Sequence, residues 1–347
     1  MSRKVAIIGD HFILPEVFER ALRSACAGID LTCRLDQNDW PNTPVEHGYG
    51  GDGTAAIKEY LGDFDQVADF VGDAEVLVMH QSPVTSAMLD RLPNLRLIAC
   101  SRGGPVNVDI DAARARNVAV TRAPGRNASA VAEFTIGAIL SESRKIRAGH
   151  EALRGGTWRG DLYRADTTGR ELSEMTVGVI GYGKIGTRLT KLLRAFATKI
   201  LVCDPYVQLD PDDVRAGVGQ VSLDVLLDRS DVVTLHPRVT AETTQMINRD
   251  TLARMKPDAL LINTARGPLC NYDDLYDALK DGVIGGAMLE TFGVEPVPAD
   301  WPLLQLPNVT LTPHIAGASV RTTTYAAEVL AEDVRRYFAN EPLLNPC

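Results

Sequence analysis

Short apolar runs alternate along this chain with longer stretches in which apolar residues recur at helical spacing. Many of the short runs contain Val and Ile, which favour strands. Strands that alternate with helices in this way predict βαβ units and a parallel sheet, and hence an α/β fold. We expect strands at residues 5–8, 76–79, 96–100, 118–121, 176–180, 199–203, 232–235, 259–263, 285–289 and 309–311, and long helices at 128–148, 183–197, 272–281 and 318–340.

The expected elements fall into two groups. Residues 1–100 form a first α/β unit, whose Gly- and Pro-rich stretch from Pro41 to Gly53 is expected to be an exposed loop. A long helix from Ala128 could link this unit to a second one. The last helix follows the final strand of the second unit and could return to pack on the first. A length of 347 residues suits two domains of ordinary size.

Composition and charge argue against several classes of protein. Hydrophobic residues make up 45% and charged residues 23% of the chain, as in globular proteins with a sizeable core. The net charge of -9 argues against broad binding to nucleic acid or to an anionic membrane. The apolar run from Val5 to Ile8 is too short for a signal peptide, and no later segment predicts a membrane span. The six cysteines include no C-x-x-C pair, which favours free thiols over metal or disulfide use. Free thiols fit a reducing compartment, so we expect a cytoplasmic protein.

A glycine pattern stands between a predicted strand and a predicted helix. Gly181, Gly183 and Gly186 follow strand 176–180 with the spacing G-x-G-x-x-G. In dinucleotide-binding proteins the first glycine permits a tight turn, the second lets backbone amides approach a pyrophosphate, and the third lets the helix pack close to the strand. The helix N-terminus adds partial positive charge for the phosphates. The pattern in this context predicts a dinucleotide site.

Asp204 narrows the prediction of the cofactor. It follows strand 199–203 and stands 18 residues after Gly186, where a carboxylate can accept hydrogen bonds from the hydroxyls of the adenosine ribose. A carboxylate there would repel the 2′-phosphate of NADP, so NAD is favoured, although Arg194 and Lys199 are basic residues close in sequence. The alternative is a structural glycine turn in another doubly wound fold, with Asp204 a solvated loop residue.

Three later strand ends carry residues suited to reducing a 2-keto acid. Arg266 follows one strand, Glu290 and Glu295 follow the next, and His314 follows the last. The reaction needs a cation to hold the substrate carboxylate, a general acid with a pKa near neutrality, and a carboxylate that orients this acid. Arg266, His314 and Glu295 fill these roles if they converge. Each of the three could instead be structural, but their occurrence together after a dinucleotide pattern favours catalysis.

Several stretches of the chain match those of one enzyme family. They are Asn107-Val-Asp109, Asn127-Ala-Ser-Ala-Val-Ala-Glu133, Val177-Gly-Val-Ile-Gly-Tyr-Gly-Lys-Ile-Gly186, Leu235-His236, Thr240-Ala-Glu-Thr243, Met255-Lys-Pro257, Leu261-Ile-Asn-Thr-Ala-Arg-Gly267, Glu295-Pro296 and Pro313-His-Ile-Ala-Gly317. With them the chain resembles the D-isomer-specific 2-hydroxyacid dehydrogenases, a family that includes phosphoglycerate dehydrogenase, glyoxylate/hydroxypyruvate reductase and D-lactate dehydrogenase. The resemblance covers most of the chain and is weakest in its first hundred residues.

The resemblance implies a Rossmann-type NAD-binding domain, built on a doubly wound parallel sheet and inserted into a flavodoxin-like α/β substrate domain. We expect the substrate domain at residues 1–103 and 318–347 and the NAD-binding domain at 104–317. The catalytic set would be Arg266, Glu295 and His314, and backbone amides near Arg102 and Gly103 would help Arg266 to hold the substrate carboxylate. The family is usually dimeric through the cofactor domain, so a homodimer is expected. The residues expected to bind NAD are Gly181, Gly183, Lys184, Ile185, Gly186, Asp204, His236, Pro237, Thr243, Thr264, Ala265, Glu290 and Gly317.

Departures from the family pattern leave the substrate open. Glu290 stands where the family usually has Asp, which could shift its contact with the nicotinamide amide. The loop from Ser101 to Pro105 replaces a glycine-alternating loop and adds Arg102, which could meet a second anionic group of a phosphorylated acid or a sugar acid. Alternatively, Arg102 points to solvent or pairs with an acidic residue. A strand end with His80, Gln81 and Ser82 supplies either pocket residues or ordinary loop residues.

The functional prediction is an NAD-dependent oxidoreductase that transfers a hydride between nicotinamide and C2 of a D-2-hydroxy acid or 2-keto acid. The chain resembles family members without the C-terminal regulatory domain of the longer phosphoglycerate dehydrogenases, so serine feedback is not expected. The alternative is an NAD(H)-binding sensor of the same fold, because the family includes transcriptional corepressors in which the catalytic residues can persist.

Overall fold

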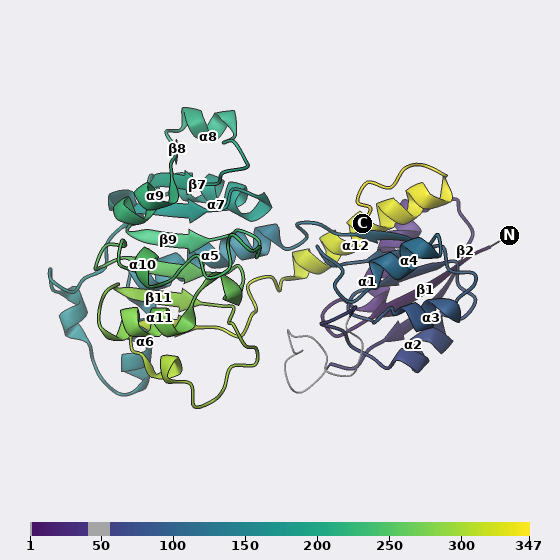
Figure 1. Ribbon diagram of the computed structural model, residues 1–347, viewed down its shortest axis with the longest axis horizontal. Helices are drawn as coiled ribbons and strands as arrows, with labels where there is room; N and C mark the ends of the chain where they lie inside the picture. Colours follow the sequence, from purple (N-terminus) through teal and green to yellow (C-terminus); the bar gives the residue numbers. More distant parts are fainter. Residues whose placement is uncertain (1, 41–55) are drawn as a thin grey trace. The chain divides into compact units, whose positions relative to one another are not determined.

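The computed structural model describes residues 2–40 and 56–347, so the loop expected from Pro41 to Gly53 lies outside the described residues. The chain forms two compact units (Figure 1). The first unit combines Met1–Asn127 with Ala318–Cys347, and the second unit is Ala128–Gly317. The polypeptide therefore leaves the first unit once and returns to it once, as expected of an inserted domain.

A five-stranded parallel sheet forms the centre of the first unit. Its strands lie in the order β2-β1-β3-β4-β5, which is the order of flavodoxin-like folds. The buried parts of β1, β3 and β4 are continuous apolar runs because helices cover both faces of the sheet. The strands are β1 (Arg3–Gly9), β2 (Leu31–Gln37), β3 (Val76–Met79), β4 (Leu97–Cys100) and β5 (Ala119–Arg122).

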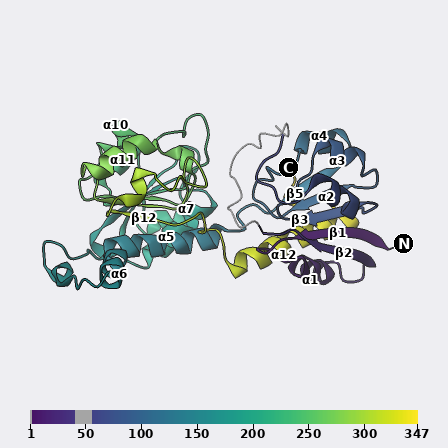
Figure 2. The same ribbon diagram turned by 90° about the horizontal axis from the view of Figure 1, so that it is seen from below.

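Two groups of helices cover this sheet, one on each face (Figure 2). On one face α1 (Pro15–Ala25) packs against the C-terminal helix α12 (Val320–Phe338), and Phe18 and Leu330 share their apolar core. The helix α12 thus belongs to the first unit although it follows the last strand of the second. The other face carries α2 (Phe64–Val71), α3 (Ser86–Asp90) and α4 (Ile110–Ala115).

A seven-stranded parallel sheet forms the centre of the second unit. Its order, β12-β11-β10-β9-β6-β7-β8, is the doubly wound Rossmann arrangement with one more strand, β12. The direction of winding reverses between β9 and β6, and sheets of this kind bind ligands beyond the carboxyl ends of the strands at that point. The strands are β6 (Thr176–Ile180), β7 (Lys199–Cys203), β8 (Gly219–Gln220), β9 (Val232–Leu235), β10 (Leu260–Asn263), β11 (Gly286–Leu289) and β12 (Val309–Leu311).

Helices also cover both faces of the second sheet. On one face α5 (Ala128–Ser143) packs against α7 (Lys184–Arg194), with Ile139 and Leu189 in their core. The other face carries α9 (Leu223–Arg229), α10 (Arg249–Leu252) and α11 (Tyr272–Lys280). The remaining helices are α6 (Ile146–Arg154) and α8 (Pro211–Arg215), with short 3-10 turns at Gly160–Tyr163, Leu172–Glu174, Gly267–Leu269 and Pro302–Gln305. The α/β fold class predicted from the sequence is confirmed.

Two expected boundaries are wrong. The boundary between residues 103 and 104 would cut through the first sheet, because β4 pairs with β5 as far as Cys100 and Arg122, so residues 104–127 belong to the first unit. The helix expected at 128–148 is interrupted at Lys145, whose left-handed φ of +58° cannot continue an α-helix.

Within the described residues, no helix combines the length and the apolar character that crossing a bilayer requires.

Candidate active site

The glycine pattern forms a tight turn between β6 and α7. Gly181 has φ +90°, a left-handed value that favours glycine, and a Cβ there would lie 2.8 Å from the carbonyl carbon of His236. A Cβ at Gly186 would collide with the carbonyl oxygen of Gly181, so α7 can approach β6 this closely only without a side chain at that position. A Cβ at Gly183, in contrast, would have no described atom within 4 Å. The turn therefore leaves space for a ligand beside Gly183.

The N-terminus of α7 is suited to an anion. Its N-cap residue is Gly183, which has no side chain with which to cap the helix, and the first turn contains no acidic residue. Backbone N–H groups at the start of a helix carry partial positive charge and bind phosphate. Lys184 and Ile185, both expected at the cofactor, are the first two residues of this helix.

Asp204 follows β7 and stabilises the glycine turn. Its Oδ2 accepts a hydrogen bond from the N–H of Tyr182 at 2.7 Å, and its Oδ1 accepts from the N–H groups of Tyr206 and Val207 at 2.9 and 3.0 Å. Asp204 is thus a partly exposed carboxylate fixed beside the turn, rather than the loosely solvated residue of the alternative interpretation. A carboxylate has about four acceptor sites, so these three bonds leave capacity for a ribose hydroxyl.

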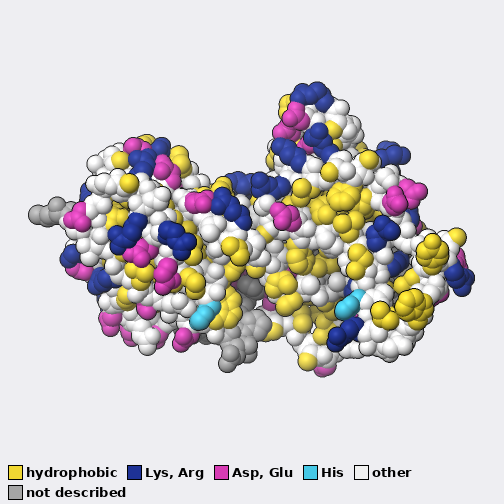
Figure 3. All heavy atoms as spheres, turned by 180° about the vertical axis from the view of Figure 1, so that it is seen from behind, with side chains coloured by type: hydrophobic (Ala, Val, Ile, Leu, Met, Phe, Trp, Pro, Cys, Tyr) yellow, Lys and Arg dark blue, Asp and Glu magenta, His cyan; other side chains and the backbone are white. Residues whose placement is uncertain are grey.

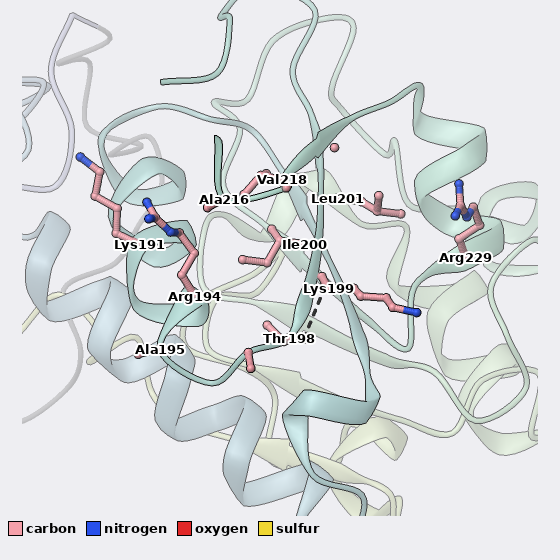
Figure 4. Close-up of a pocket in the computed structure, with 13 residues that line it drawn as sticks. Lys191, Arg194, Ala195, Thr198, Lys199, Ile200, Leu201, Ala216, Val218 and Arg229 are labelled. Carbon is pink, nitrogen blue, oxygen red and sulfur yellow. Dashed lines mark hydrogen bonds between the residues drawn. The ribbon is translucent and has the colours of Figure 1, made fainter. Parts of the chain in front are cut away.

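The two basic residues close to Asp204 in sequence do not lie beside it. Arg194 donates to the buried Asp213 at 2.8 Å, and Lys199 begins β7, at the end of the strand opposite Asp204. Both line a hollow of about 770 Å³, where Figure 4 shows their side chains pointing in different directions. Neither cation is therefore placed to hold a 2′-phosphate next to Asp204.

The loop after β9 packs against the glycine turn through His236 and Pro237. His236 Nε2 lies 2.9 Å from Thr234 Oγ1, and the buried Nδ1 has no hydrogen-bond partner in the described part of the chain. Burial lowers the pKa of His236 to about 3, so the ring is neutral at neutral pH. Thr243, also expected at the cofactor, uses its hydroxyl within its own turn, where it donates to the carbonyl of Arg238 at 2.6 Å.

Arg266 stands on the loop after β10, which side-chain hydrogen bonds hold in place. Asn263 donates from Nδ2 to the carbonyl of Arg266 and accepts from the N–H of Ala265, both at 3.1 Å. The hydroxyl of Thr264 lies 2.9 Å from that of Thr135 in α5. Arg266 itself is exposed, and its Nη1 donates to the carbonyl of Ala265 at 2.7 Å. The backbone is thus fixed while the cationic side chain remains accessible.

Glu290 is buried directly after β11 and joins two loops. Its Oε1 accepts a hydrogen bond from the N–H of Ala316 at 2.6 Å, and its carbonyl accepts one from the N–H of His314 at 3.0 Å. Burial raises the pKa of Glu290 to about 7, although the bond from Ala316 acts in the opposite direction. Glu290 therefore holds the β12 loop, which carries His314 and Gly317, against the β11 loop.

Glu295 and His314 form a hydrogen-bonded pair. His314 Nδ1 lies 2.8 Å from Glu295 Oε2, and Glu295 Oε1 accepts from the N–H of Phe292 at 2.7 Å. A carboxylate only accepts, so Nδ1 carries the proton and a substrate would meet Nε2. The His314 side chain is 26% exposed and that of Glu295 is 10% exposed. The φ of His314 is +52°, a left-handed value that costs a non-glycine residue about 1–3 kcal/mol and is concentrated at functional sites.

The predicted residues of the second unit gather at one edge of its sheet. All seven strands are parallel, so the loops that follow them emerge at the same edge. A Cβ at Gly267 would collide with the carbonyl of Phe292, which shows how closely the loop of Arg266 approaches the loop of Glu295. Glu295 in turn contacts His314. The three residues expected in catalysis therefore lie on three successive, mutually packed loops of one compact unit.

In the first unit, Arg102 forms an ion pair. Its Nη1 donates to the carbonyl of Glu59 at 3.0 Å and its Nη2 donates to the Glu59 carboxylate. The interpretation that Arg102 pairs with an acidic residue is therefore the one that the structure shows, and the hypothesis that Arg102 binds a second anionic group of the substrate loses its support. The carbonyl of Arg102 accepts from the N–H of Ala123 at 2.9 Å, which holds the loop that includes Gly103. Binding of a carboxylate by the amides of this loop stays a prediction.

A buried polar cluster lies at the carboxyl edge of the first sheet, and most of it was not predicted from the sequence. Asp10 follows β1, His80 follows β3 and Arg126 comes shortly after β5. His80 Nδ1 lies 2.6 Å from Asp10 Oδ2, and Arg126 Nη2 lies 3.0 Å from His80 Nε2. The sequence singled out only His80. The signal that could have found all three is that polar residues just after parallel strands meet at one edge of the sheet.

Comparison with known proteins decides the family. The family model for the D-isomer-specific 2-hydroxyacid dehydrogenase, NAD-binding domain, matches residues 136–316. A glyoxylate reductase from Thermofilum pendens is 38% identical over 259 residues, which are 75% of this chain and 76% of that protein. The chain belongs to the D-isomer-specific 2-hydroxyacid dehydrogenase family.

A second curated relative and a solved structure are similar over comparable lengths. A D-3-phosphoglycerate dehydrogenase from Mycobacterium tuberculosis is 35% identical over 280 residues, which are 80% of this chain but 52% of that protein. Among solved structures, the TT0316 protein from Thermus thermophilus is 28% identical, with a TM-score of 0.78 and 99% of both chains covered. The resemblance stated from the sequence is confirmed.

The second unit is the NAD-binding domain of this family, since the matched residues lie within it. The cofactor expected from the sequence, NAD, is therefore confirmed. The residues present fit a dinucleotide, because the turn is open beside Gly183, α7 begins there without a side-chain cap of its own, and Asp204 is fixed next to it.

Proposed function

We propose that this protein interconverts D-2-hydroxy acids and 2-keto acids with NAD, using Arg266, Glu295 and His314. The observation that carries the proposal is the hydrogen bond of 2.8 Å between Glu295 and His314, on loops that pack next to the loop of Arg266 in the NAD-binding unit. A partly exposed histidine held by a carboxylate can give and take a proton, and an accessible arginine can bind a carboxylate.

His314 would act as the acid in reduction and as the base in oxidation. NADH, when bound, supplies the hydride that C2 of a keto acid receives. Because Glu295 occupies Nδ1–H, the proton that goes to the substrate oxygen at C2 is the one on Nε2, and the same nitrogen takes it back in the reverse direction. Glu295 is itself oriented by the N–H of Phe292, so it stabilises the positively charged ring without having to reorganise.

Arg266 would hold the substrate. A guanidinium donates two parallel hydrogen bonds to a carboxylate, and its positive charge polarises a neighbouring carbonyl. The side chain of Asn263 fixes the backbone from which the Arg266 side chain extends, through its bonds to Ala265 and Arg266. The amides near Arg102 and Gly103 would bind the same carboxylate of the substrate.

The expected cofactor residues divide by their position along the sheet. The start of α7, with Lys184 and Ile185, would bind the pyrophosphate, and Asp204 would bind the adenosine ribose. His236 and Glu290, which follow strands on the other side of the switch point, would lie toward the nicotinamide. The hydroxyl of Thr243 is used in its own turn, so any contact it made with the cofactor would require that turn to change.

The names of the relatives suggest the class of substrate. Two of them are named for glyoxylate and for D-3-phosphoglycerate, so their names span a two-carbon keto acid and a phosphorylated hydroxy acid. Both contain the C1 carboxylate and the C2 oxygen that Arg266 and His314 are proposed to meet. We therefore propose a small 2-hydroxy or 2-keto acid as the substrate of this chain.

An exposed apolar segment supports a homodimer formed through the second unit. None of the residues of α6 is buried, and residues 146–163, which begin with α6, expose Leu153, Trp158 and Tyr163. The exposed fractions of Trp158 and Tyr163 are 83% and 95%. Hydrophobic side chains gather on the face of this unit that Figure 3 shows. Surfaces of this kind mark protein interfaces. Light scattering of the purified chain should give twice the monomer mass, and a Trp158→Ser, Tyr163→Ser double variant should give the monomer mass. A monomeric wild type would contradict the proposal.

Replacement of His314 by alanine tests the proposed chemistry. We expect turnover of a 2-keto acid to fall by a factor of about 100 to 10,000, because the proton donor is lost. The affinity for NADH, measured by fluorescence, should remain within about threefold. The exposed Glu171 of the same unit offers a control, and Glu171→Ala should leave both quantities unchanged. Near-normal turnover by His314→Ala would show that another group supplies the proton.

The wild type itself discriminates between an enzyme and an NAD(H)-binding sensor. We expect it to oxidise NADH in the presence of at least one member of a panel of 2-keto acids. If it binds NADH but oxidises it with none of them, the sensor becomes the better account.

A further inference from the structure

The cluster of Asp10, His80 and Arg126 has a defined pattern of hydrogen bonds. A guanidinium only donates, so Nε2 of His80 accepts from Arg126 and the ring proton resides on Nδ1, which donates to Asp10. Asp10 also accepts from the N–H groups of Phe12 and Ile13 at 2.9 and 2.8 Å. Two hydrogen bonds thus fix the imidazole, two more fix the Asp10 carboxylate that holds it, and the imidazole fixes one edge of the Arg126 guanidinium.

The imidazole that contacts Arg126 is neutral. Burial lowers the pKa of His80 to about 4, although the hydrogen bond to Asp10 acts in the opposite direction. The partner of the Arg126 guanidinium is therefore an uncharged ring nitrogen, and Arg126 forms no ion pair with a residue of the described ranges. The positive charge of Arg126 is held in place but not neutralised by direct contact.

Arg126 also has an unused donor. Its Nη1 is buried and has no hydrogen-bond acceptor among the described residues. The guanidinium lies 5.8 Å from the ring centroid of Phe12, which contacts the cation without accepting a conventional hydrogen bond. The positive charge of Arg102 adds to that of Arg126, and both oppose protonation of His80. A buried cationic donor without an acceptor is costly, so this position is suited to an anion.

Two further polar atoms on neighbouring strand ends lack partners. Ser101 follows β4 and its buried hydroxyl makes no hydrogen bond to a described residue, and the same holds for the side-chain oxygen of Gln81, which follows β3. A serine hydroxyl can donate to an oxyanion, and an amide oxygen can accept from a hydroxyl group. The strands β3, β4 and β5 are adjacent, so Gln81, Ser101 and Arg126 emerge at the same edge of the sheet.

We infer that the first unit contains a binding site for a small oxyanion, a carboxylate or a phosphate group, whose charge Arg126 meets through Nη1. Asp10 and His80 are positioning residues, since they act on the anion only by orienting Arg126. The oxyanion is either a second acidic group of the substrate or a free anion. If the oxyanion is a group of the substrate, the inference rests on the proposed function, because it then assigns a substrate class to that reaction. If the oxyanion is a free anion, the inference does not depend on the proposed function.

Direct binding tests the site without requiring turnover. Calorimetry would measure the affinity of the full chain for inorganic phosphate and for malonate in the wild type, Arg126→Gln and Arg126→Lys. We expect Arg126→Gln to bind the anions at least about 10-fold more weakly, with Arg126→Lys in between because it keeps the charge but not the planar fork. The matched control is Arg91→Gln, since Arg91 forms ion pairs with Asp65 and Asp69 on the surface of the same unit. Unfolding temperatures would identify a variant that fails to fold, in which case Arg126→Lys alone decides.

A pair of substrates of equal length distinguishes the two sources. The ratio of kcat/KM for 2-oxoglutarate to that for 2-oxovalerate should fall at least about 10-fold in Arg126→Gln if the second carboxylate of the substrate occupies the site. A constant ratio together with weaker phosphate binding would assign the site to a free anion. Equal anion binding by the wild type, Arg126→Gln and Arg91→Gln, or no binding by any of them, would overturn the inference. A wild type that reduces no 2-keto acid would contradict the proposed function but leave the binding result intact.

Discussion

Replacement of Glu295 by glutamine perturbs the proton donor without changing its surroundings. Glutamine has the shape of glutamate, and its amide oxygen can accept the N–H of Phe292 as Oε1 does at 2.7 Å. The amide NH₂ then faces His314 Nδ1, which Glu295 Oε2 meets at 2.8 Å in the wild type. Because an NH₂ group donates, Nδ1 must become an acceptor, and the ring becomes neutral with its proton on Nε2.

The neutral ring should be a much weaker acid. Donating from Nε2 would leave an anionic ring, and the variant also lacks the negative charge that stabilises the positively charged ring. A misplaced general acid costs about 100- to 10,000-fold in rate, which corresponds to about 3 to 5 kcal/mol of transition-state free energy. We therefore expect kcat for the reduction of a 2-keto acid to fall within that range in Glu295→Gln.

Steady-state kinetics with saturating NADH, together with fluorescence titration of NADH, would separate chemistry from binding. The exposed Glu171 is in the same unit, and Glu171→Gln is the matched control, which should change neither quantity. The reasoning would be refuted if Glu295→Gln kept kcat within about threefold of the wild type, because the hydrogen bond to His314 would then have no role in the proton transfer.

Three further predictions concern the cofactor turn and the buried glutamate. Asp204→Asn should raise the ratio of kcat/KM for NADP to that for NAD by about 10-fold, because the repulsion of the 2′-phosphate disappears; an unchanged ratio would contradict the assigned role. Gly186→Ala should lower the unfolding temperature by several degrees because its Cβ meets the Gly181 carbonyl. Gly183→Ala has open space and loses only the N-cap preference for glycine, so it should lower the temperature less, as differential scanning calorimetry would show. Burial raises the pKa of Glu290 from 4.5, the value for the unfolded chain, to about 7 in the folded protein. The unfolded chain therefore releases this proton at a lower pH than the folded protein does. The free energy of unfolding should fall as the pH rises from about 4.5 to 7, by up to roughly 3 kcal/mol. Urea unfolding at pH 5 and pH 8 should show a smaller difference for Glu290→Gln than for the wild type, and an equal difference would contradict the burial argument.

Most of the strands that the sequence predicted are buried on both faces of a sheet, although β7 and β12 are only partly buried. All ten expected strands are present, and a buried strand such as β3 or β4 is recognisable because it is a continuous apolar run. The strand β2 was missed because it lies at the edge of its sheet and alternates between half-buried and exposed residues. The two-residue strand β8 is too short to leave a pattern. The expected helix 128–148 is continuous in composition, and nothing local in the sequence marks the left-handed residue Lys145 that interrupts it.

The positions of Arg266, Glu295 and His314 were predictable for a related reason. Each follows a strand of one parallel sheet, and parallel strands end at a common edge. The ion pair of Arg102 with Glu59 was not predictable, because it joins residues 43 positions apart through a side chain whose direction the backbone pattern does not specify. Arg126 and Asp10 were missed because neither is part of a stretch that matches the family, although Arg126 directly precedes one, and only the packing of strand ends brings them to His80.

The stereochemistry of the product tests the central claim most directly. The wild type would be incubated with NADH and a panel of 2-keto acids that includes pyruvate, hydroxypyruvate and 2-oxoglutarate, and each product would be separated by chiral chromatography. The proposed function predicts that NADH is consumed with at least one acid and that an equal amount of the D-2-hydroxy acid appears. Formation of the L-isomer, or no consumption of NADH with any 2-keto acid, would contradict it.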